Sequence, residues 1–199
     1  MNNAANTNKV RKTIFEDETY KGVDFLKQGF ANSEYENCAF VNCAFSNSDL
    51  SNFVFSECEF HGCDLSLAKV NKTSFRGAKF YECKLLGMHF EHCNKLLFSA
   101  EFENSILNLS SFYKLSVKRT RFKNCSIREV DFTECDLSGS LFDNCDLDKA
   151  IFQKTILDKV DFRTSYNYSI DPERNRIKKA KFSIVGIAGL LDNYDIEIE

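Results

Sequence analysis

Large apolar residues recur at every fifth position along most of this chain. One series runs without a break from Phe15 to Phe90, and a second runs from Leu97 to Phe162. The step between the two series is seven residues, which places a two-residue register slip within residues 91–96. A period of five matches neither the 3.6-residue turn of a helix nor the two-residue alternation of a strand. The pattern predicts a chain that turns a corner every five residues and directs one large side chain inward from each side.

A second inward position lies two residues before each large one and holds small or thin side chains, mostly Cys, Ala and Val. Other identities recur at intervals of twenty, as in Asn104, Asn124 and Asn144. Four such sides make a square coil of twenty residues, so we predict an all-β fold, a quadrilateral parallel β-helix that buries its core by stacking coils. Asparagine tolerates turn conformations, and we place it at five successive corners: Asn32, Asn37, Asn42, Asn47 and Asn52.

The pattern divides the chain into three segments. Residues 1–12 are polar, lack the apolar region of a signal peptide, and are expected to be disordered. Residues 13–167 form the β-helix, and residues 168–199 follow it as a C-terminal cap. Without an apolar run near the ~20 residues of a membrane span, we expect no membrane association and a cytoplasmic location, where thiols stay reduced.

The composition agrees with a repeat in which the same core position recurs many times and is usually occupied by Phe. The 199 residues include twenty Phe, no Trp and one Pro. The net charge is −3, so nothing in the whole chain favours direct binding to nucleic acid.

The nine cysteines all lie two residues before an expected core position. Metal sites group their ligands in pairs such as C-x-x-C, and an odd count in a reducing compartment argues against disulfides. We therefore interpret eight of them as free core residues: Cys38, Cys43, Cys58, Cys63, Cys83, Cys125, Cys135 and Cys145. The ninth, Cys93, lies near His89 and His92, which are good zinc ligands without a fourth partner at a suitable spacing.

No catalytic motif is present, neither a nucleophile elbow, nor a zinc-protease motif, nor a phosphate-binding loop. The sequence therefore predicts neither a catalytic site, nor a bound metal, nor a cofactor, and the protein is expected not to be an enzyme.

Charge is distributed coil by coil. Residues 109–128 carry six bases and no acid, whereas residues 129–148 carry seven acids and no base. Neighbouring coils could pair these charges across the stack, at about 0.5 kcal/mol for each exposed pair. Alternatively, the acids could form a band that competes with DNA for a basic protein surface. The acids of this coil are Glu129, Asp131, Glu134, Asp136, Asp143, Asp146 and Asp148.

The C-terminal segment predicts a short helix followed by an alternating strand. Ser183 is placed to cap a helix over residues 184–192, and Gly186 and Gly189 weaken that helix, so packing must hold it. Residues 195–199, DIEIE, alternate as a half-exposed strand does. The apolar residues that we assign to this cap are Ile184, Ile187, Leu190, Leu191, Tyr194, Ile196 and Ile198.

Units such as CAF, AKF, CDLSG and CDLDK resemble the pentapeptide-repeat family, whose consensus is loosely A(D/N)LXX. The resemblance implies a right-handed β-helix. The tail IDPERNRIKKAKFSIVGIAGLLDNYDIEIE and the stretch FENSILNLSSFYKL resemble the topoisomerase-protecting members, the Qnr-type quinolone-resistance proteins and above all the albicidin-resistance protein.

That closer resemblance implies a homodimer joined through the C-terminal segment. It also implies a DNA mimic that binds DNA gyrase or topoisomerase IV and relieves poisoning by quinolones or albicidin-like antibiotics, as a resistance or self-immunity factor. The repeats alone also permit the alternative of a structural or scaffolding protein with an unrelated partner.

Overall fold

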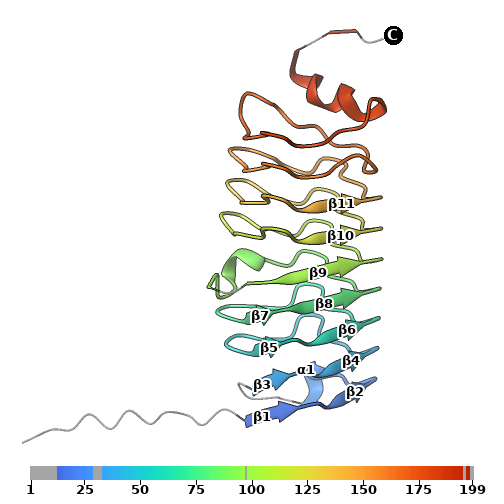
Figure 1. Cartoon of the computed structure of the whole chain (residues 1–199). Helices are drawn as coiled ribbons and strands as arrows, with labels where there is room; N and C mark the ends of the chain where they lie inside the picture. Colours follow the sequence, from blue (N-terminus) through green and yellow to red (C-terminus); the bar gives the residue numbers. More distant parts are fainter. Residues whose placement is uncertain (1–12, 29–32, 97, 195, 198–199) are drawn as a thin grey trace, which may run out of the picture.

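The computed structural model describes residues 13–28, 33–96, 98–194 and 196–197. Their backbone winds into stacked coils that build a rod, with the C-terminal segment across one end (Figure 1). The strands are short. The first four coils have one strand on each of two sides, and the later coils have described strands on one of these sides alone. The strands are β1 (Thr13–Glu16), β2 (Thr19–Lys21), β3 (Ser33–Glu36), β4 (Ala39–Val41), β5 (Val54–Ser56), β6 (Glu59–His61), β7 (Ser74–Arg76), β8 (Ala78–Tyr81), β9 (Ala100–Glu103), β10 (Arg121–Lys123) and β11 (Leu141–Asp143).

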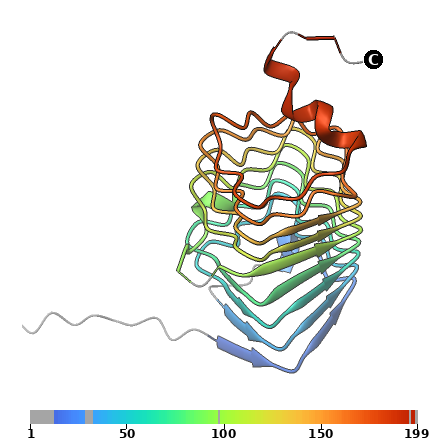
Figure 2. The same ribbon diagram turned by 45° about the horizontal axis from the view of Figure 1, so that its top comes forward.

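All strand pairs are parallel, and they form two sheets. One has the order β1-β3-β5-β7 and the other the order β11-β10-β9-β8-β6-β4-β2. Pairs such as Tyr35 with Phe55 and Phe40 with Phe60 join residues twenty apart. The predicted twenty-residue coil and the parallel β-helix are thereby confirmed, and Figure 2 shows the sides of successive coils lying over one another.

We number the sides in chain order. Face 1 is the β1-β3-β5-β7 side and continues through residues 115–119, 135–139, 155–159 and 175–179. Face 2 is the seven-stranded sheet, and faces 3 and 4 complete the square with residues such as 125–129 and 130–133.

The large residues of each face stack into columns inside the rod. On face 2 the rings of Phe102, Phe122 and Phe142 are parallel, with centroids 5.2 and 4.7 Å apart. The column runs from Tyr20 to Phe182, and rings of adjacent faces meet edge-on. Both arrangements are favourable for aromatic pairs, so a repeated aromatic residue packs against the same neighbours at successive levels.

The corners lie two residues after each central residue and adopt left-handed backbone conformations. Asn37, Asn42, Asn47 and Asn52 have φ between 51° and 66°. These four confirm the predicted role of Asn, while Asn32 lies outside the described residues. An asparagine ladder also follows the edge between faces 2 and 3, where Asn124 donates to Asn104 at 3.0 Å and Asn144 donates to Asn124 at 2.9 Å.

The eight cysteines that we assigned to the core are free and buried, and so is Cys93. The structure adds a polar role, because thiols in this position donate to the carbonyl oxygen of the residue 23 places earlier. Cys63 donates to Phe40 at 3.2 Å, and Cys83 donates to Phe60 at 3.3 Å. Ser140 and Thr155 make the same bond from the same position, so the position selects a small side chain that can donate.

The register slip is a local lengthening of one coil. Ala78 pairs with Ala100 and Phe80 pairs with Phe102, an offset of 22 residues. The offset is still twenty at Asn94, whose amide donates to the Ser74 hydroxyl. The two extra residues therefore lie between Asn94 and Ala100, after a 3₁₀ helix, η1 (Phe90–His92).

Phe98 is a core residue that the five-residue register missed. Its side chain is buried, and its ring lies edge-on to those of Phe75 and Phe90. The expected central residues Phe30 and Leu97 lie outside the described residues. Shortly before Phe30 in the sequence, a single helical turn, α1 (Phe25–Gln28), interrupts face 3 of the first coil.

The β-helix continues beyond the expected boundary at residue 167. Parallel bridges join Ile156 to Arg176 and Asp161 to Lys181. A turn over residues 172–174 replaces a regular side of face 4, and the coil then resumes at Asn175. The cap therefore begins after Phe182, and residues 1–12 lie outside the described residues.

The cap is formed by two 3₁₀ helices, η2 (Val185–Leu190) and η3 (Asp192–Tyr194), where we predicted one α-helix. The N-cap of the first is Ile184 and not the predicted Ser183, although the Ser183 hydroxyl accepts from the Gly186 amide at 3.0 Å. The predicted strand over 195–199 is wrong for its described members, because Ile196 and Glu197 have no strand structure. A strand needs a neighbour to pair with, and the cap ends above the last coil.

Glycine is required where the cap meets the last coil. A Cβ atom on Gly189 would lie 2.0 Å from the backbone oxygen of Tyr168. At this close approach the Ile170 amide donates to the Gly189 oxygen at 2.8 Å. Packing therefore holds the cap, as the weak helical propensity of its glycines required.

Candidate functional site

The seven acids of residues 129–148 lie around the rod and do not gather on one face. Asp131 lies on face 4, Asp136 on face 1, and Asp143 on face 2, whereas Asp146 and Asp148 lie on face 3. Glu129 and Glu134 occupy corners with φ of 55° and are exposed. The predicted band is therefore a ring.

Basic residues of the coil below pair with part of this ring. Lys118 lies 3.0 Å from Asp136, and Lys114 lies 3.6 Å from Glu134. Asp136 also accepts from the backbone and the hydroxyl of Ser138. Burial opposes ionisation of Asp136, but the Ser138 hydrogen bonds and the Lys118 ammonium hold its pKa below the usual range. This arrangement agrees with the pairing interpretation of the charge pattern.

Asp146 is the most enclosed member of the ring. Arg128 donates to one carboxylate oxygen at 2.6 Å, and Asn167 donates to the other at 2.8 Å. Burial of Asp146 is outweighed by these two contacts, which lower its pKa. With its side chain 8% exposed, Asp146 joins three coils and presents little charge to a partner.

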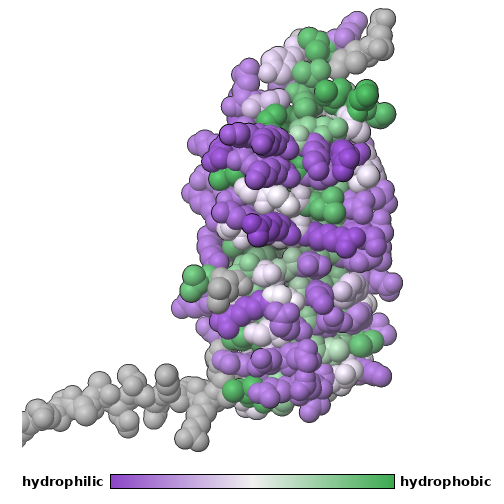
Figure 3. Space-filling model, viewed as in Figure 1, coloured by the Kyte–Doolittle hydropathy of each residue, from purple (hydrophilic) through white to green (hydrophobic). Residues whose placement is uncertain are grey.

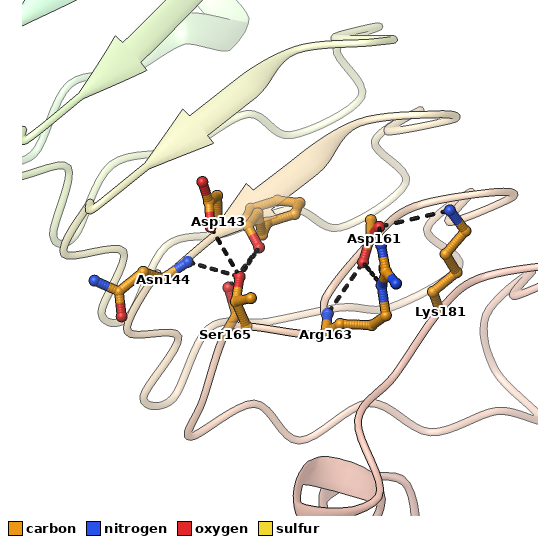
Figure 4. Close-up of polar contacts among 8 residues, drawn as sticks. Asp143, Asn144, Asp161, Arg163, Ser165 and Lys181 are labelled. Carbon is orange, nitrogen blue, oxygen red and sulfur yellow. Dashed lines mark hydrogen bonds and ion pairs between the residues drawn. The ribbon is translucent and has the colours of Figure 1, made fainter.

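The coil above repeats this pattern (Figure 4). Asp161 accepts from Arg163 at 2.8 Å and lies 3.6 Å from Lys181 in the next coil. Asp143 accepts from the Thr164 hydroxyl at 3.1 Å. The outward polar residues thus join neighbouring coils along the rod. Glu129 and Glu134 are the most exposed acids of the ring formed by residues 129–148.

Another group of acids lies at the N-terminal end. An open cleft of about 510 Å³ is lined by Glu16, Asp17, Glu36, Asn37 and Glu57. Asp17 accepts from the Asn37 amide. The sequence interpretation did not single out these acids, because they are spread over three coils and become neighbours only when the coils stack.

The cap presents an exposed apolar surface at the opposite end of the rod (Figure 3). Ile184 and Val185 are 92% and 93% exposed, and Ile187 is half exposed. Tyr194 and Ile196 are also exposed, whereas Leu190 packs against the core and Leu191 is half-buried. Ile198 lies outside the described residues. Val185, which the predicted set omitted, is one of the two most exposed large apolar residues among those that the structure describes.

A groove separates this surface from the last coil. It has a volume of about 480 Å³ and lies between Tyr166, Asp148 and Asn167 on one side and Val185 and Asp192 on the other. Buried Tyr168 forms its floor under Gly186 and Gly189, a contact that the sequence interpretation missed because no repeat position predicts it.

The histidines near the register slip do not converge on a metal site. His89 contacts Glu91 at 2.9 Å and stacks on His92, whereas the Cys93 thiol is buried and burial raises its pKa. Over the described ranges, no group of three His, Cys, Asp or Glu side chains could hold a metal ion.

Two family models match this chain. The model of the pentapeptide repeat region matches residues 95–166, and the model of eight pentapeptide repeats matches residues 38–77 and 58–94. The chain belongs to the pentapeptide-repeat family. The matched residues form an unbroken range from 38 to 166, which contains the coils described above.

Three solved structures match the chain at low sequence identity. QnrB1, a plasmid-mediated fluoroquinolone resistance protein, is 18% identical, with a TM-score of 0.48 over 92% of this chain and 100% of that chain. HetL, involved in heterocyst differentiation regulation in the cyanobacterium Nostoc, is 16% identical, with a TM-score of 0.37 over 84% of each chain. Rfr23 from the cyanobacterium Cyanothece is 12% identical, with a TM-score of 0.26 over 86% of this chain and 85% of that one.

No curated protein matches the chain. No helix within the described part of the chain is both long and apolar enough to cross a membrane.

Proposed function

We propose that this pentapeptide-repeat protein acts by binding and not by catalysis, and that its partner is a type II topoisomerase, either DNA gyrase or topoisomerase IV. It protects that enzyme from a poison such as a quinolone or an albicidin-like antibiotic. The observation that carries the proposal is the C-terminal segment, whose sequence resembles topoisomerase-protecting members and whose exposed Ile184 and Val185 need a partner surface.

The cap supports assembly into a homodimer through the end of the rod. A two-fold axis there would bring Ile184 of each protomer against the same apolar surface of its partner. Leu190 packs against the core of its own chain, so the dimer would use the outer residues of the cap. The nine reduced thiols agree with a cytoplasmic protein.

DNA mimicry would depend on the carboxylates that remain exposed. Glu129 and Glu134 project from corners of the predicted ring. Residues 13–109 add fourteen acids against eight bases, so the N-terminal half would attract a basic surface through long-range electrostatics.

The experiment is a gyrase supercoiling assay, with and without a quinolone or an albicidin-type poison. We expect the protein to restore supercoiling in the presence of the poison at micromolar concentration. The variant Ile184→Asp/Val185→Asp should lose this effect and become monomeric, whereas Ile151→Asp, on an exposed position of face 4, should act as wild type. If micromolar protein neither inhibits supercoiling nor protects it from the poison, the proposal is refuted.

A scaffolding role is the second candidate, favoured by a specific observation. The acidic coil lies between two basic ones and pairs with the lower one through Lys118 and Arg128, which makes these charges part of the rod itself. Failure of both DNA gyrase and topoisomerase IV to bind the wild type would favour this role.

A further inference from the structure

The C-terminal half of the rod separates its charges by face, although the whole chain is slightly acidic. Within residues 110–183, face 1 with its two flanking corners carries nine bases and three acids. Face 2 carries four bases and two acids, face 3 two bases and three acids, and face 4 three acids and no base. The excess positive charge of this half is therefore concentrated on one side.

The edge between faces 1 and 2 is the most basic line on that side. Its successive corners are Arg119, Gly139, Lys159 and Lys179, all in left-handed conformations. A Cβ on Gly139 would lie in ordinary contact, 3.6 Å from the side chain of Arg119, so the arginine stem extends along the edge over this corner. We call Arg119, Lys159, Lys178 and Lys179 the basic ridge.

The ridge residues are not neutralised by the rod itself. Asp158 is the one acid on face 1 in the last two coils, and it pairs with Arg176. The side chains of Lys159, Lys178 and Lys179 are exposed, and none of the ion pairs among the described residues includes them or Arg119. Coils stack at about 4.8 Å, so the cations of the last two coils lie close together, and Arg119 follows two coils below Lys159.

A row of exposed cations that form no ion pair with the rod matches a repeating array of anions. Duplex DNA carries one negative charge per ~1.7 Å of its axis, and lysines gain affinity there by releasing counterions. We propose that the basic ridge binds the phosphate backbone of duplex DNA without reading its sequence. The acidic N-terminal half would be held away from the duplex, which would orient the rod on it. This inference stands on the charge distribution alone and does not require the proposed topoisomerase partner.

The test is equilibrium binding of the full chain to a fluorescent 20-base-pair duplex, measured by anisotropy between 50 and 200 mM NaCl. With about four phosphate contacts, affinity should fall about 10²-fold over this range. Lys159→Glu/Lys179→Glu should weaken binding at least about 10-fold at 50 mM and lower the salt slope by about two. Both substitutions are compatible with the fold, because Glu57 and Glu129 already occupy equivalent corners.

The matched control is Lys72→Glu/Lys149→Glu, which makes the same charge change at exposed corners away from the ridge. It should retain wild-type affinity within about 3-fold. Equal weakening by both pairs, or no binding of the wild type at 50 mM NaCl, would overturn the inference. Binding to vesicles rich in anionic phospholipid but not to the duplex would also overturn it. Because topoisomerase is absent from this assay, its outcome is independent of the supercoiling test.

Discussion

At the scale of single residues, the corners show how the repeat tolerates sequence variation. Asparagine and glycine suit the left-handed region, yet leucine, lysine, arginine and glutamate also occupy it here. Residues with a full side chain adopt this region at a cost of about 1 kcal/mol or more. The coil imposes the conformation because both neighbouring sides are fixed by stacking.

Leu109 offers a direct test of this cost, because its φ is 60° and its side chain is 54% exposed. Leu109→Asn should raise the free energy of unfolding by about 0.5–1 kcal/mol, measured by urea denaturation. Leu86→Asn is the control, since Leu86 is exposed on the same face without a left-handed backbone. Equal effects of the two substitutions would show that polarity, and not backbone strain, is responsible.

The buried thiols predict a loss of stability at high pH. Burial raises the pKa of the Cys58 thiol to about 12, whereas an unfolded thiol ionises near 8.5. The unfolded state therefore loses its proton first, and stability that is complete below about pH 8.5 falls as the pH rises toward 12. In Cys58→Ser the free energy of unfolding should fall less steeply with pH between 9 and 11. The difference in slope should correspond to about one proton fewer released on unfolding. An unchanged slope would mean that Cys58 ionises in the folded state.

At the scale of elements, the columns of rings and the cap contribute differently to stability. Phe122 is fully buried in the middle of the face 2 column, so its removal leaves a cavity between two rings. The sequence predicted this column, because one residue type at a fixed spacing of five leaves little choice of fold. It did not predict the contact of Gly189 with Tyr168 or the inward position of Phe98, because neither belongs to a repeat.

Phe122→Ala should destabilise the protein by about 3–5 kcal/mol, because a buried ring is lost and stacked coils relax poorly around the cavity. Phe182→Ala should lower the free energy of unfolding by less, since Phe182 is only partly buried at the end of the same column. Chemical denaturation of both variants measures the difference. If both variants lost the same free energy of unfolding, the inner rings would not contribute more than the ring at the end, which would contradict the column as described.

Gly189→Ala should detach the cap without unfolding the coils. The new methyl group would clash with the backbone oxygen of Tyr168 and break the bond from the Ile170 amide. Hydrogen exchange at Ile170 should accelerate at least about 10-fold, while exchange at Phe122 stays slow. Ala188→Gly, which adds no atom, is the control. Slow exchange at Ile170 in Gly189→Ala would show that the cap can repack.

At the scale of the whole molecule, stacking of the coils brings residues that are far apart in the sequence together on separate surfaces. The apolar cap lies at one end, the basic ridge follows one edge, and acids predominate toward the N-terminal end. The acidic ring of residues 129–148 was visible in the sequence, but its partners were not, because pairs such as Arg128 and Asp146 meet only when the coils stack. The same reason hid the basic ridge, whose members are separated by up to sixty residues.

The most direct test of the proposed function is the amount of cleaved DNA that a poison traps on gyrase, measured against protein concentration. We expect the wild type to lower poison-dependent cleavage in a saturable manner, and Ile184→Asp/Val185→Asp to leave it unchanged at the same concentrations. Undiminished cleavage at saturating wild-type protein, with both gyrase and topoisomerase IV, would contradict the proposed protection of a type II topoisomerase.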